Sequence, residues 1–290
     1  MIEALSEYIF AEPRRLNVFG GNLAYWDINP DRAETIVMIH GFRGNHLGLR
    51  RVIAELPGYR VIIADLPGFG LSEPMTERRH DLEGYSAVFA ELIKNLGISD
   101  PHILGHSFGS LVAARLVAAR PRGRGKFILI NAIAVSPREL SNPVASRLVD
   151  FYYWLGYSLP EPIGERVLNN QLYARGLSRL LDTSHDPQMR RFILKHHLGD
   201  LIFKVKPRVI RESYAASMSE GVVDIVSGRG LSALIIAGAL DPIAPVASQQ
   251  RLESVMPDSQ LDIIAGVGHL VPLEQPKRAA QLIQRYIDKT

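Results

Sequence analysis

Six short runs of consecutive apolar residues recur along this chain, and each is about as long as one β-strand. Apolar residues on both strand faces are typical of parallel strands buried between two layers of helices. Segments with helical periodicity separate most of the runs. The alternation predicts an α/β protein with a mostly parallel sheet and helices on both of its faces. The runs are residues 35–40, 60–65, 101–106, 126–131, 233–238 and 261–266, and the helical segments are 46–56, 82–96, 108–120, 246–255 and 273–287.

Two parts of the chain depart from this alternation. Residues 15–28 alternate loosely around Gly20-Gly21-Asn22, which favours an antiparallel hairpin. About a hundred residues separate the run that ends at Asn131 from the run that begins at Ala233, far more than a crossover needs. That interval shows helical patterns and no convincing strand. We therefore expect a core domain of residues 1–136 and 229–290, with a helical insertion at 137–228.

Bulk composition excludes several classes of function. The chain has no cysteine, so disulfides, thiolate metal sites and cysteine nucleophiles are ruled out. Its 33 basic residues are interspersed with 30 acidic ones, and this pattern does not favour nucleic-acid binding. The first residues, MIEALSEYIFAEP, carry acids where a signal peptide needs bases, and no apolar run reaches transmembrane length. We expect a cytoplasmic protein without membrane insertion.

A serine between two glycines marks one strand-to-helix junction. The stretch Gly105-His106-Ser107-Phe108-Gly109 follows an apolar run and precedes a helical segment. A nucleophile elbow needs this arrangement, because the sharp turn leaves no room for neighbouring side chains and lifts the hydroxyl above the sheet. A serine nucleophile also needs a histidine base and an acid that orients it, here expected in the order Ser, acid, His. Asp241 and His269 follow the last two apolar runs in that order, where catalytic groups of open α/β sheets gather.

The oxyanion of a tetrahedral intermediate needs hydrogen-bond donors near the serine. The segment His40-Gly41-Phe42 follows an apolar run, and Phe108 comes directly after the serine. Their position predicts that the backbone N–H groups of Phe42 and Phe108 form the oxyanion hole.

Five motifs in order make almost the whole chain resemble the α/β-hydrolase superfamily. They are HGFRGN, DLPGFGLS, GHSFGS, GALDPI and GVGH. The resemblance implies the α/β-hydrolase fold, with a mostly parallel eight-stranded sheet. It also implies Ser107 as the nucleophile, Asp241 as the orienting acid and His269 as the general base. Residues 137–228 would then be a cap that forms the substrate pocket.

Several residues invite a plainer interpretation. Asp241 could simply cap the following helix, although the other position at which the superfamily places its acid holds Asn131 here. His40 and His106 flank the catalytic segments and are expected to pack and hydrogen-bond locally. The neighbours His196 and His197 would face different directions on a helix, which does not suit a metal site. Aromatic residues of the insertion are predicted to line the substrate pocket, namely Phe151, Tyr152 and Trp154.

The serine at the elbow disfavours epoxide hydrolases and haloalkane dehalogenases, because resemblance to those enzymes would require an aspartate there. We expect a serine hydrolase that cleaves carboxylic esters of small to medium acyl chain through an acyl-enzyme on Ser107. The alternatives are a hydrolase that splits a C–C bond of ring-cleavage products with the same triad, and a non-catalytic ligand-binding homologue. Cofactor-free oxygenase or perhydrolase chemistry on this scaffold also stays open. The expected partner is a small-molecule ester. We expect no cofactor, metal or nucleic acid. The sequence does not indicate which oligomeric state the protein adopts.

Overall fold

A single eight-stranded sheet runs through the molecule in the computed structural model, which describes residues 12–120, 123–140 and 143–289. The strand order is β1-β2-β4-β3-β5-β6-β7-β8. The first two strands pair antiparallel, β2 pairs antiparallel with β4, and the remaining neighbours are parallel. The six apolar runs are all strands of this sheet, so the prediction of a mostly parallel α/β fold is confirmed. The strands are β1 (Arg14–Val18), β2 (Gly21–Ile28), β3 (Thr35–Ile39), β4 (Arg60–Ala64), β5 (His102–His106), β6 (Phe127–Ile130), β7 (Leu234–Gly238) and β8 (Gln260–Ile264).

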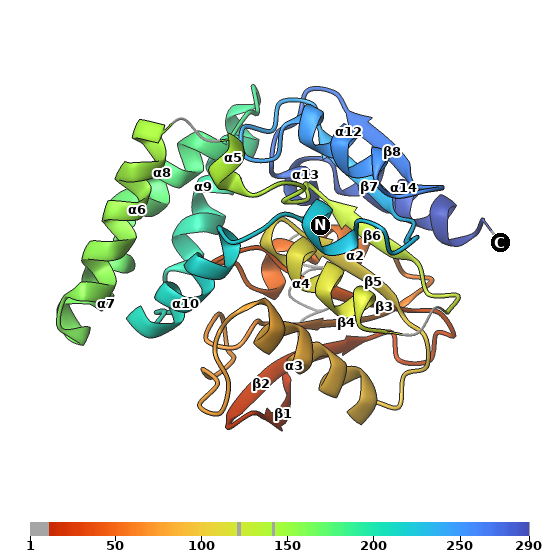
Figure 1. Cartoon of the computed structure of the whole chain (residues 1–290), viewed down its shortest axis with the longest axis horizontal. Helices are drawn as coiled ribbons and strands as arrows, with labels where there is room; N and C mark the ends of the chain where they lie inside the picture. Colours follow the sequence, from red (N-terminus) through yellow and green to blue (C-terminus); the bar gives the residue numbers. More distant parts are fainter. Residues whose placement is uncertain (1–11, 121–122, 141–142, 290) are drawn as a thin grey trace.

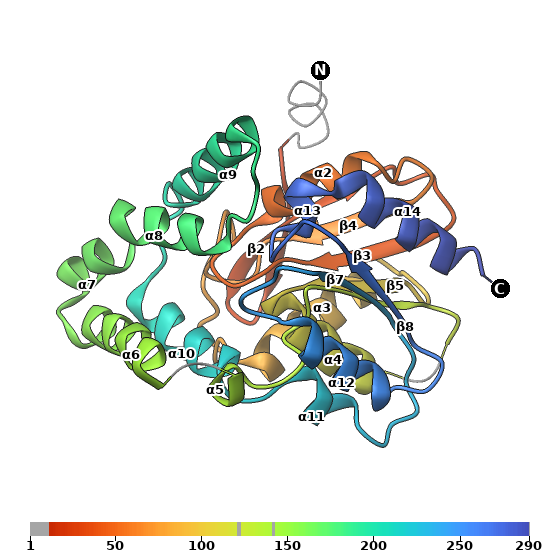
Figure 2. The ribbon, with the colours of Figure 1, turned by 90° about the horizontal axis from the view of Figure 1, so that it is seen from above.

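Helices cover both faces of the sheet (Figures 1 and 2), and alternate residues of β3 (Thr35–Ile39) belong to two different buried clusters. On one face Ile36 and Met38 pack with α2 (Arg50–Ala54), α13 (Val271–Glu274) and α14 (Pro276–Ile287). On the other face Val37 and Ile39 pack with α3 (Leu82–Asn95), α4 (Phe108–Ala118), α11 (Val222–Val226) and α12 (Val246–Ser254). This two-sided burial explains why the central parallel strands, such as β3 and β7, are apolar at consecutive positions.

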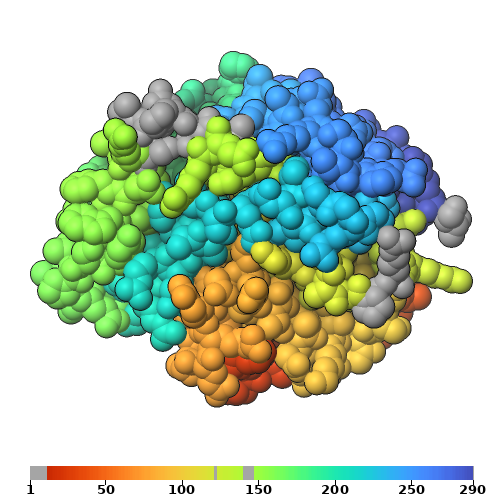
Figure 3. All heavy atoms as spheres, in the orientation of Figure 1, coloured from red at the N-terminus to blue at the C-terminus, as the bar shows by residue number. Residues whose placement is uncertain are grey.

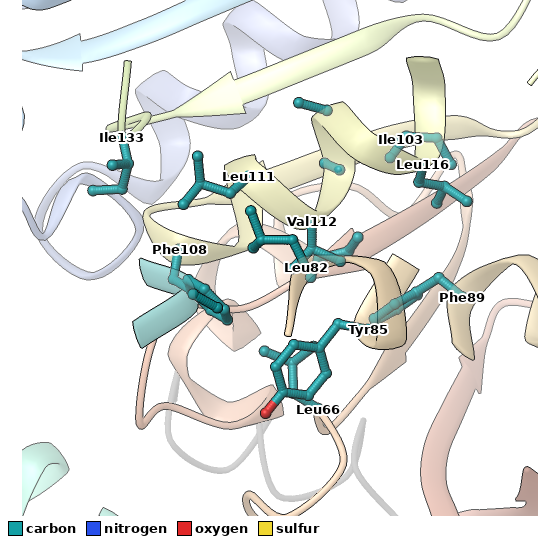
Figure 4. Packing of buried hydrophobic residues seen from close by; sticks show 14 of the residues in the cluster. Leu66, Leu82, Tyr85, Phe89, Ile103, Phe108, Leu111, Val112, Leu116 and Ile133 are labelled. Carbon is teal, nitrogen blue, oxygen red and sulfur yellow. The ribbon is translucent and has the colours of Figure 1, made fainter. Parts of the chain in front are cut away.

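On the second of these faces, α3 and α4 pack against each other close to the nucleophile elbow. Figure 4 shows Phe108 at the start of α4 facing Tyr85 of α3, with Leu66 and Leu82 close by. The two rings meet edge to face with their centroids 5.8 Å apart. This packing anchors the first turn of α4, and with it the residue that precedes the helix.

The insertion between β6 and β7 is helical in the parts that the structure describes. Five of its helices form a lobe beside the core, coloured green and teal in Figures 1 and 3. The next helix, α11, instead packs on the core, where the N–H groups of Val222 and Val223 donate to the carbonyls of Ile133 and Ala134. The insertion contains the short helix α5 (Pro137–Leu140) and then α6 (Pro143–Ser158), α7 (Glu161–Leu168), α8 (Gln171–Leu181), α9 (Pro187–Asp200) and α10 (Pro207–Ser217).

Two local details differ from the expected element bounds. The hairpin turns at Phe19-Gly20, both at positive φ, so that Val18 pairs with Gly21. The expected helix at 273–287 is divided into α13 and α14, because Pro276 has no N–H with which to continue a helix. The acidic N-terminal stretch that argued against a signal peptide lies mostly outside the described residues.

Candidate active site

Ser107 occupies a sharp turn between β5 and α4. Its backbone angles, φ 54° and ψ −123°, lie in a region that non-glycine residues rarely adopt. Two glycines make the turn possible. A Cβ at Gly105 would lie 2.4 Å from the carbonyl oxygen of Gly109, and a Cβ at Gly109 would lie 2.3 Å from that of Ile39. The serine is therefore held in a strained conformation by backbone that approaches too closely for any side chain.

Gly109→Ala is expected to destabilise the protein by about 1–3 kcal/mol, because the methyl group would press on backbone atoms that cannot move independently of the sheet. Gly176→Ala is the matched control, since Gly176 also lies in a helix but a Cβ there would meet nothing within 4 Å. That control should gain about 0.5–1 kcal/mol from helix propensity. Urea denaturation measures both changes. Equal effects of the two substitutions would contradict the account of the elbow.

The three residues of the predicted triad form one hydrogen-bonded chain. The hydroxyl of Ser107 lies 2.8 Å from Nε2 of His269, and Nδ1 of His269 lies 2.8 Å from Oδ2 of Asp241. Ser107 follows β5, Asp241 follows β7 and His269 follows β8, so the carboxyl ends of three parallel strands bring them together. With the proton on Nδ1 facing the carboxylate, Nε2 is free to accept the serine proton.

Asp241 is fixed by four hydrogen bonds. Its Oδ1 accepts from the N–H groups of Ile243 and Ala244 at 2.8 and 2.9 Å, and its Oδ2 accepts from His269 and from Nδ2 of Asn131 at 2.8 Å. Burial alone would raise its pKa, but His269 and the two N–H donors outweigh burial and lower it. The bonds to Ile243 and Ala244 hold the turn that follows β7, whereas α12 (Val246–Ser254) has Pro245 as its N-cap, so Asp241 does not cap that helix.

Asn131 has a positioning contact that the sequence did not reveal. It is fully buried at the end of β6 with φ 47°, and its amide donates to Asp241 and to the carbonyl of Gly268 at 3.2 Å. The sequence offered one signal for it: Asn131 follows the strand that precedes the strand of Asp241, at the same edge of the sheet. Asn131 therefore joins the acid to the loop that carries His269.

His106 supports the same loop from beside the nucleophile. Its Nε2 lies 3.3 Å from the backbone carbonyl of His269. Burial lowers the pKa of His106 to about 3, with a smaller contribution from His269, so the ring is neutral at physiological pH and donates this bond. His40 contacts the carbonyl of Gly41 and accepts from the N–H of Leu66, so both histidines bond to backbone groups near the catalytic segments that they flank.

The buried neutral state of His106 predicts acid sensitivity. Its pKa is about 3 in the folded protein and near 6.5 in the unfolded chain, so only the unfolded state binds the proton between these values. Stability should fall by up to about 1.4 kcal/mol per pH unit as pH drops below 6.5. We expect His106→Gln to lose about 2 kcal/mol less than wild type between pH 7.5 and pH 5. Urea denaturation at both pH values measures this, and identical losses would contradict it.

The two predicted oxyanion donors lie close to the serine. Phe108 is the first residue of α4, so its N–H has no acceptor within the helix. A Cβ at Gly41 would lie 3.2 Å from Cβ of Ser107, which places the loop before Phe42 against the nucleophile. Among the described residues, neither N–H of this pair has an acceptor. The rings of Phe42 and Phe108 pack edge to face at 6.0 Å and hold the two segments together.

A cavity of about 320 Å³ opens at the triad. Ser107, His269 and Phe42 lie in its wall, and the insertion supplies the facing wall. One part of that wall is aromatic, with Tyr153, Tyr173 and Tyr214. A polar part of the lining comprises His196, His197 and Asp200 of the insertion together with Asn45 of the loop after β3.

The three aromatic residues predicted to contact substrate lie outside this cavity lining. Phe151 is 57% exposed and Trp154 is 50% exposed, and their rings stack on each other. Tyr152 donates to the carbonyls of Val167 and Leu168, away from the cavity. Helix geometry gives the reason: Tyr153, only 2% exposed, is on the inward face of α6, so its neighbours in sequence point elsewhere.

In the parts of the chain that the structure describes, no three His, Asp or Glu side chains gather as a metal site would require. Over the same residues no helix combines the length and the apolar character needed to span a bilayer.

The fold agrees with comparisons to known proteins. A model described as alpha/beta hydrolase family matches residues 36–282, and the chain belongs to that family. An uncharacterized hydrolase, YugF, from Bacillus subtilis is 26% identical over 94% of this chain and 97% of its own length. A 2-hydroxymuconate semialdehyde hydrolase from Pseudomonas putida is 27% identical over 79% of this chain and 76% of its own.

Among solved structures, an esterase from Exiguobacterium antarcticum superposes with a TM-score of 0.78. The match covers 96% of this chain and all of the esterase, at 18% sequence identity. At that identity the likeness establishes the α/β-hydrolase fold, with its eight-stranded sheet and helical insertion.

Proposed function

We propose that this protein is a serine hydrolase that cleaves carboxylic esters of small to medium acyl chain through an acyl-enzyme on Ser107. The observation that carries the proposal is the hydrogen-bonded chain from Asp241 through His269 to Ser107, which ends at the wall of a cavity. A volume of about 320 Å³ is near the lower end for ligand pockets, which favours short chains. This chain shares its fold with the esterase from Exiguobacterium antarcticum, and that fold is compatible with ester hydrolysis.

In the acylation step, Nε2 of His269 takes the proton of the Ser107 hydroxyl as the oxygen attacks the ester carbonyl carbon. The carbonyl oxygen gains the negative charge and accepts hydrogen bonds from the N–H groups of Phe42 and Phe108. When the tetrahedral intermediate collapses, the bond to the leaving alkoxide breaks and His269 returns the proton to that oxygen. The alcohol departs, and the acyl group stays on Ser107.

Deacylation reverses the roles with water in place of the alcohol. His269 removes a proton from water as the water oxygen attacks the acyl carbon, and the same two N–H groups stabilise the second oxyanion. Collapse breaks the bond to Ser107, whose oxygen recovers the proton from His269. Asp241 keeps the proton of His269 on Nδ1 throughout and stabilises the imidazolium when it forms.

The helical insertion at 137–228 acts as a cap in this proposal, because its tyrosines form the cavity wall opposite the serine. Acyl length and leaving group would then depend on the cap rather than on the triad.

A C–C bond hydrolase is the second candidate. The curated relative from Pseudomonas putida bears the name 2-hydroxymuconate semialdehyde hydrolase, and such chemistry can use the same triad. The ester and C–C hydrolases differ in substrate, so direct comparison of substrates separates them.

A panel of p-nitrophenyl esters from acetate to palmitate tests the proposed function, with ring-cleavage dienones assayed in parallel. The proposal expects a burst of p-nitrophenol and an optimum among the shorter chains. Turnover of dienones without turnover of esters would establish the second candidate instead. A protein that hydrolyses neither and resists labelling by a fluorophosphonate would be a non-catalytic binder, and the proposal would be wrong.

A further inference from the structure

The polar part of the cavity lies where α9 of the insertion meets the loop after β3. Oδ1 of Asp200 accepts a hydrogen bond from Nδ2 of Asn45 at 2.7 Å. Among the described residues, the ion-pair contact of Oδ2 is with Nε2 of His196 at 3.8 Å, which is too long for a hydrogen bond. All three residues line the same cavity as Ser107.

Only one carboxylate oxygen of Asp200 accepts a hydrogen bond from the residues that the structure describes. Asn45 donates to Oδ1 while its own carbonyl oxygen accepts from the N–H of Leu47, and this arrangement ties α9 to the core. Among the described residues no hydrogen bond reaches Oδ2. The side chain as a whole is 14% exposed and lines the cavity.

No cation neutralises this carboxylate in the described parts of the chain. Its single ion-pair contact is His196, whose pKa is lowered to about 4 by burial and by Arg50, so that the ring is uncharged at neutral pH. Burial raises the pKa of Asp200 to about 6, while His197 and the bond from Asn45 oppose the rise. At pH 7.5 the site therefore presents a carboxylate with one oxygen unsatisfied.

We propose that Asn45, His196 and Asp200 form a subsite that binds a hydrogen-bond donor, a hydroxyl or an ammonium group, at the far end of the substrate. The inference rests on the proposed ester hydrolysis and names the class of ester. An alkyl tail beside Oδ2 would exclude water from it and offer no hydrogen bond in return. A donor group at the same place would supply the hydrogen bond that water can no longer make. The subsite would thus reject a purely hydrocarbon tail and accept a polar one of the same size.

Four ethyl esters of nearly equal size test this proposal: ethyl 6-hydroxyhexanoate, ethyl 6-aminohexanoate, ethyl heptanoate and monoethyl adipate. The series is repeated with the same four tails in the alcohol half of butyrate esters, since either half could occupy the polar part of the cavity. Proton release at pH 7.5 measures kcat/KM for each. We expect the hydroxyl or ammonium ester to exceed the heptanoate by at least about tenfold in one series.

Asp200→Asn is the sharpest variant. The asparagine keeps an oxygen for Asn45 but places an NH₂ donor where Oδ2 was, so the ratio of kcat/KM for donor tails to kcat/KM for the heptanoate should fall to about one. Asp186→Asn is the matched control, because Asp186 is exposed at the start of the same helix and caps it through an interaction that asparagine can also make.

The outcomes separate this inference from the proposed function. Equal kcat/KM for hydroxyl, ammonium and methyl tails in wild type, with turnover intact, would overturn the subsite and leave the esterase standing. A preference for the adipate would also overturn it and would place recognition at Arg43, the guanidinium in the cavity wall. Retention of the donor preference in Asp200→Asn would exclude Asp200 as its source. Failure of every ester, including those of the p-nitrophenyl panel, would remove both proposals together.

Discussion

Ser107→Ala is expected to lower kcat by about 10⁵ to 10⁶ on every ester that the protein hydrolyses, because among the described residues Ser107 is the hydroxyl that Nε2 of His269 can activate. The hydroxyl contacts His269 at 2.8 Å, and alanine removes this bond without changing the backbone requirement at φ 54°. KM should change little, since the cavity and the two oxyanion N–H groups stay in place. Initial rates with the best p-nitrophenyl ester measure the loss.

Ser254→Ala is the matched control for this substitution, because Ser254 is exposed on α12 and its hydroxyl contacts only the carbonyl of Arg251 one turn earlier. Both variants should keep the wild-type melting temperature within a few degrees. A Ser107→Ala protein that retains more than about one hundredth of wild-type kcat would contradict the assignment.

Asp241→Asn is expected to lower kcat by about 10⁴, the loss seen when a triad acid is replaced by its amide. The contacts around this residue explain the direction. Two backbone N–H groups donate to Oδ1, so the amide oxygen of an asparagine would settle there. Its NH₂ group would then face Nδ1 of His269 and force the ring proton onto Nε2. In that tautomer His269 cannot accept the proton of Ser107.

This second prediction is checked by kcat together with stability. The melting temperature should fall only modestly, because an asparagine keeps the bonds from Ile243 and Ala244. Asn131 faces the same NH₂ group, and its amide can turn to offer its oxygen instead. A loss smaller than tenfold in kcat would mean that Asp241 does not orient His269, and that holding the turn at Ile243 and Ala244 is its main role.

Much of the fold followed from local patterns that tertiary structure did not override. The apolar runs at 35–40 and 233–238 form strands, because a short run that is apolar at consecutive positions is typical of a strand buried on both faces. Ser107, Asp241 and His269 could be located because each follows a strand, and parallel strands place their carboxyl ends at one edge. The order of these elements therefore carried the information about the site.

Other features depend on contacts that no local pattern encodes. The inward face of α6 includes Tyr153 rather than Phe151 or Trp154, and this phase is set by packing against Tyr173 and Tyr214. The bond between Asn45 and Asp200 joins residues 155 positions apart. Asn45 ends the HGFRGN motif, but no motif surrounds Asp200, and nothing in the sequence connects the two residues. A single sequence gives the spacing of side chains along an element. Which side of a cap helix faces inward depends on the surface that the helix covers.

The most direct test of the account is to identify the residue that carries the acyl group. The protein is mixed with a short p-nitrophenyl ester, quenched with acid during the burst, digested and mapped by mass spectrometry. We predict one acyl adduct, on the peptide that contains Ser107, and none in Ser107→Ala. An adduct on a different residue, or a burst of p-nitrophenol that leaves no adduct on Ser107, would contradict the proposed mechanism.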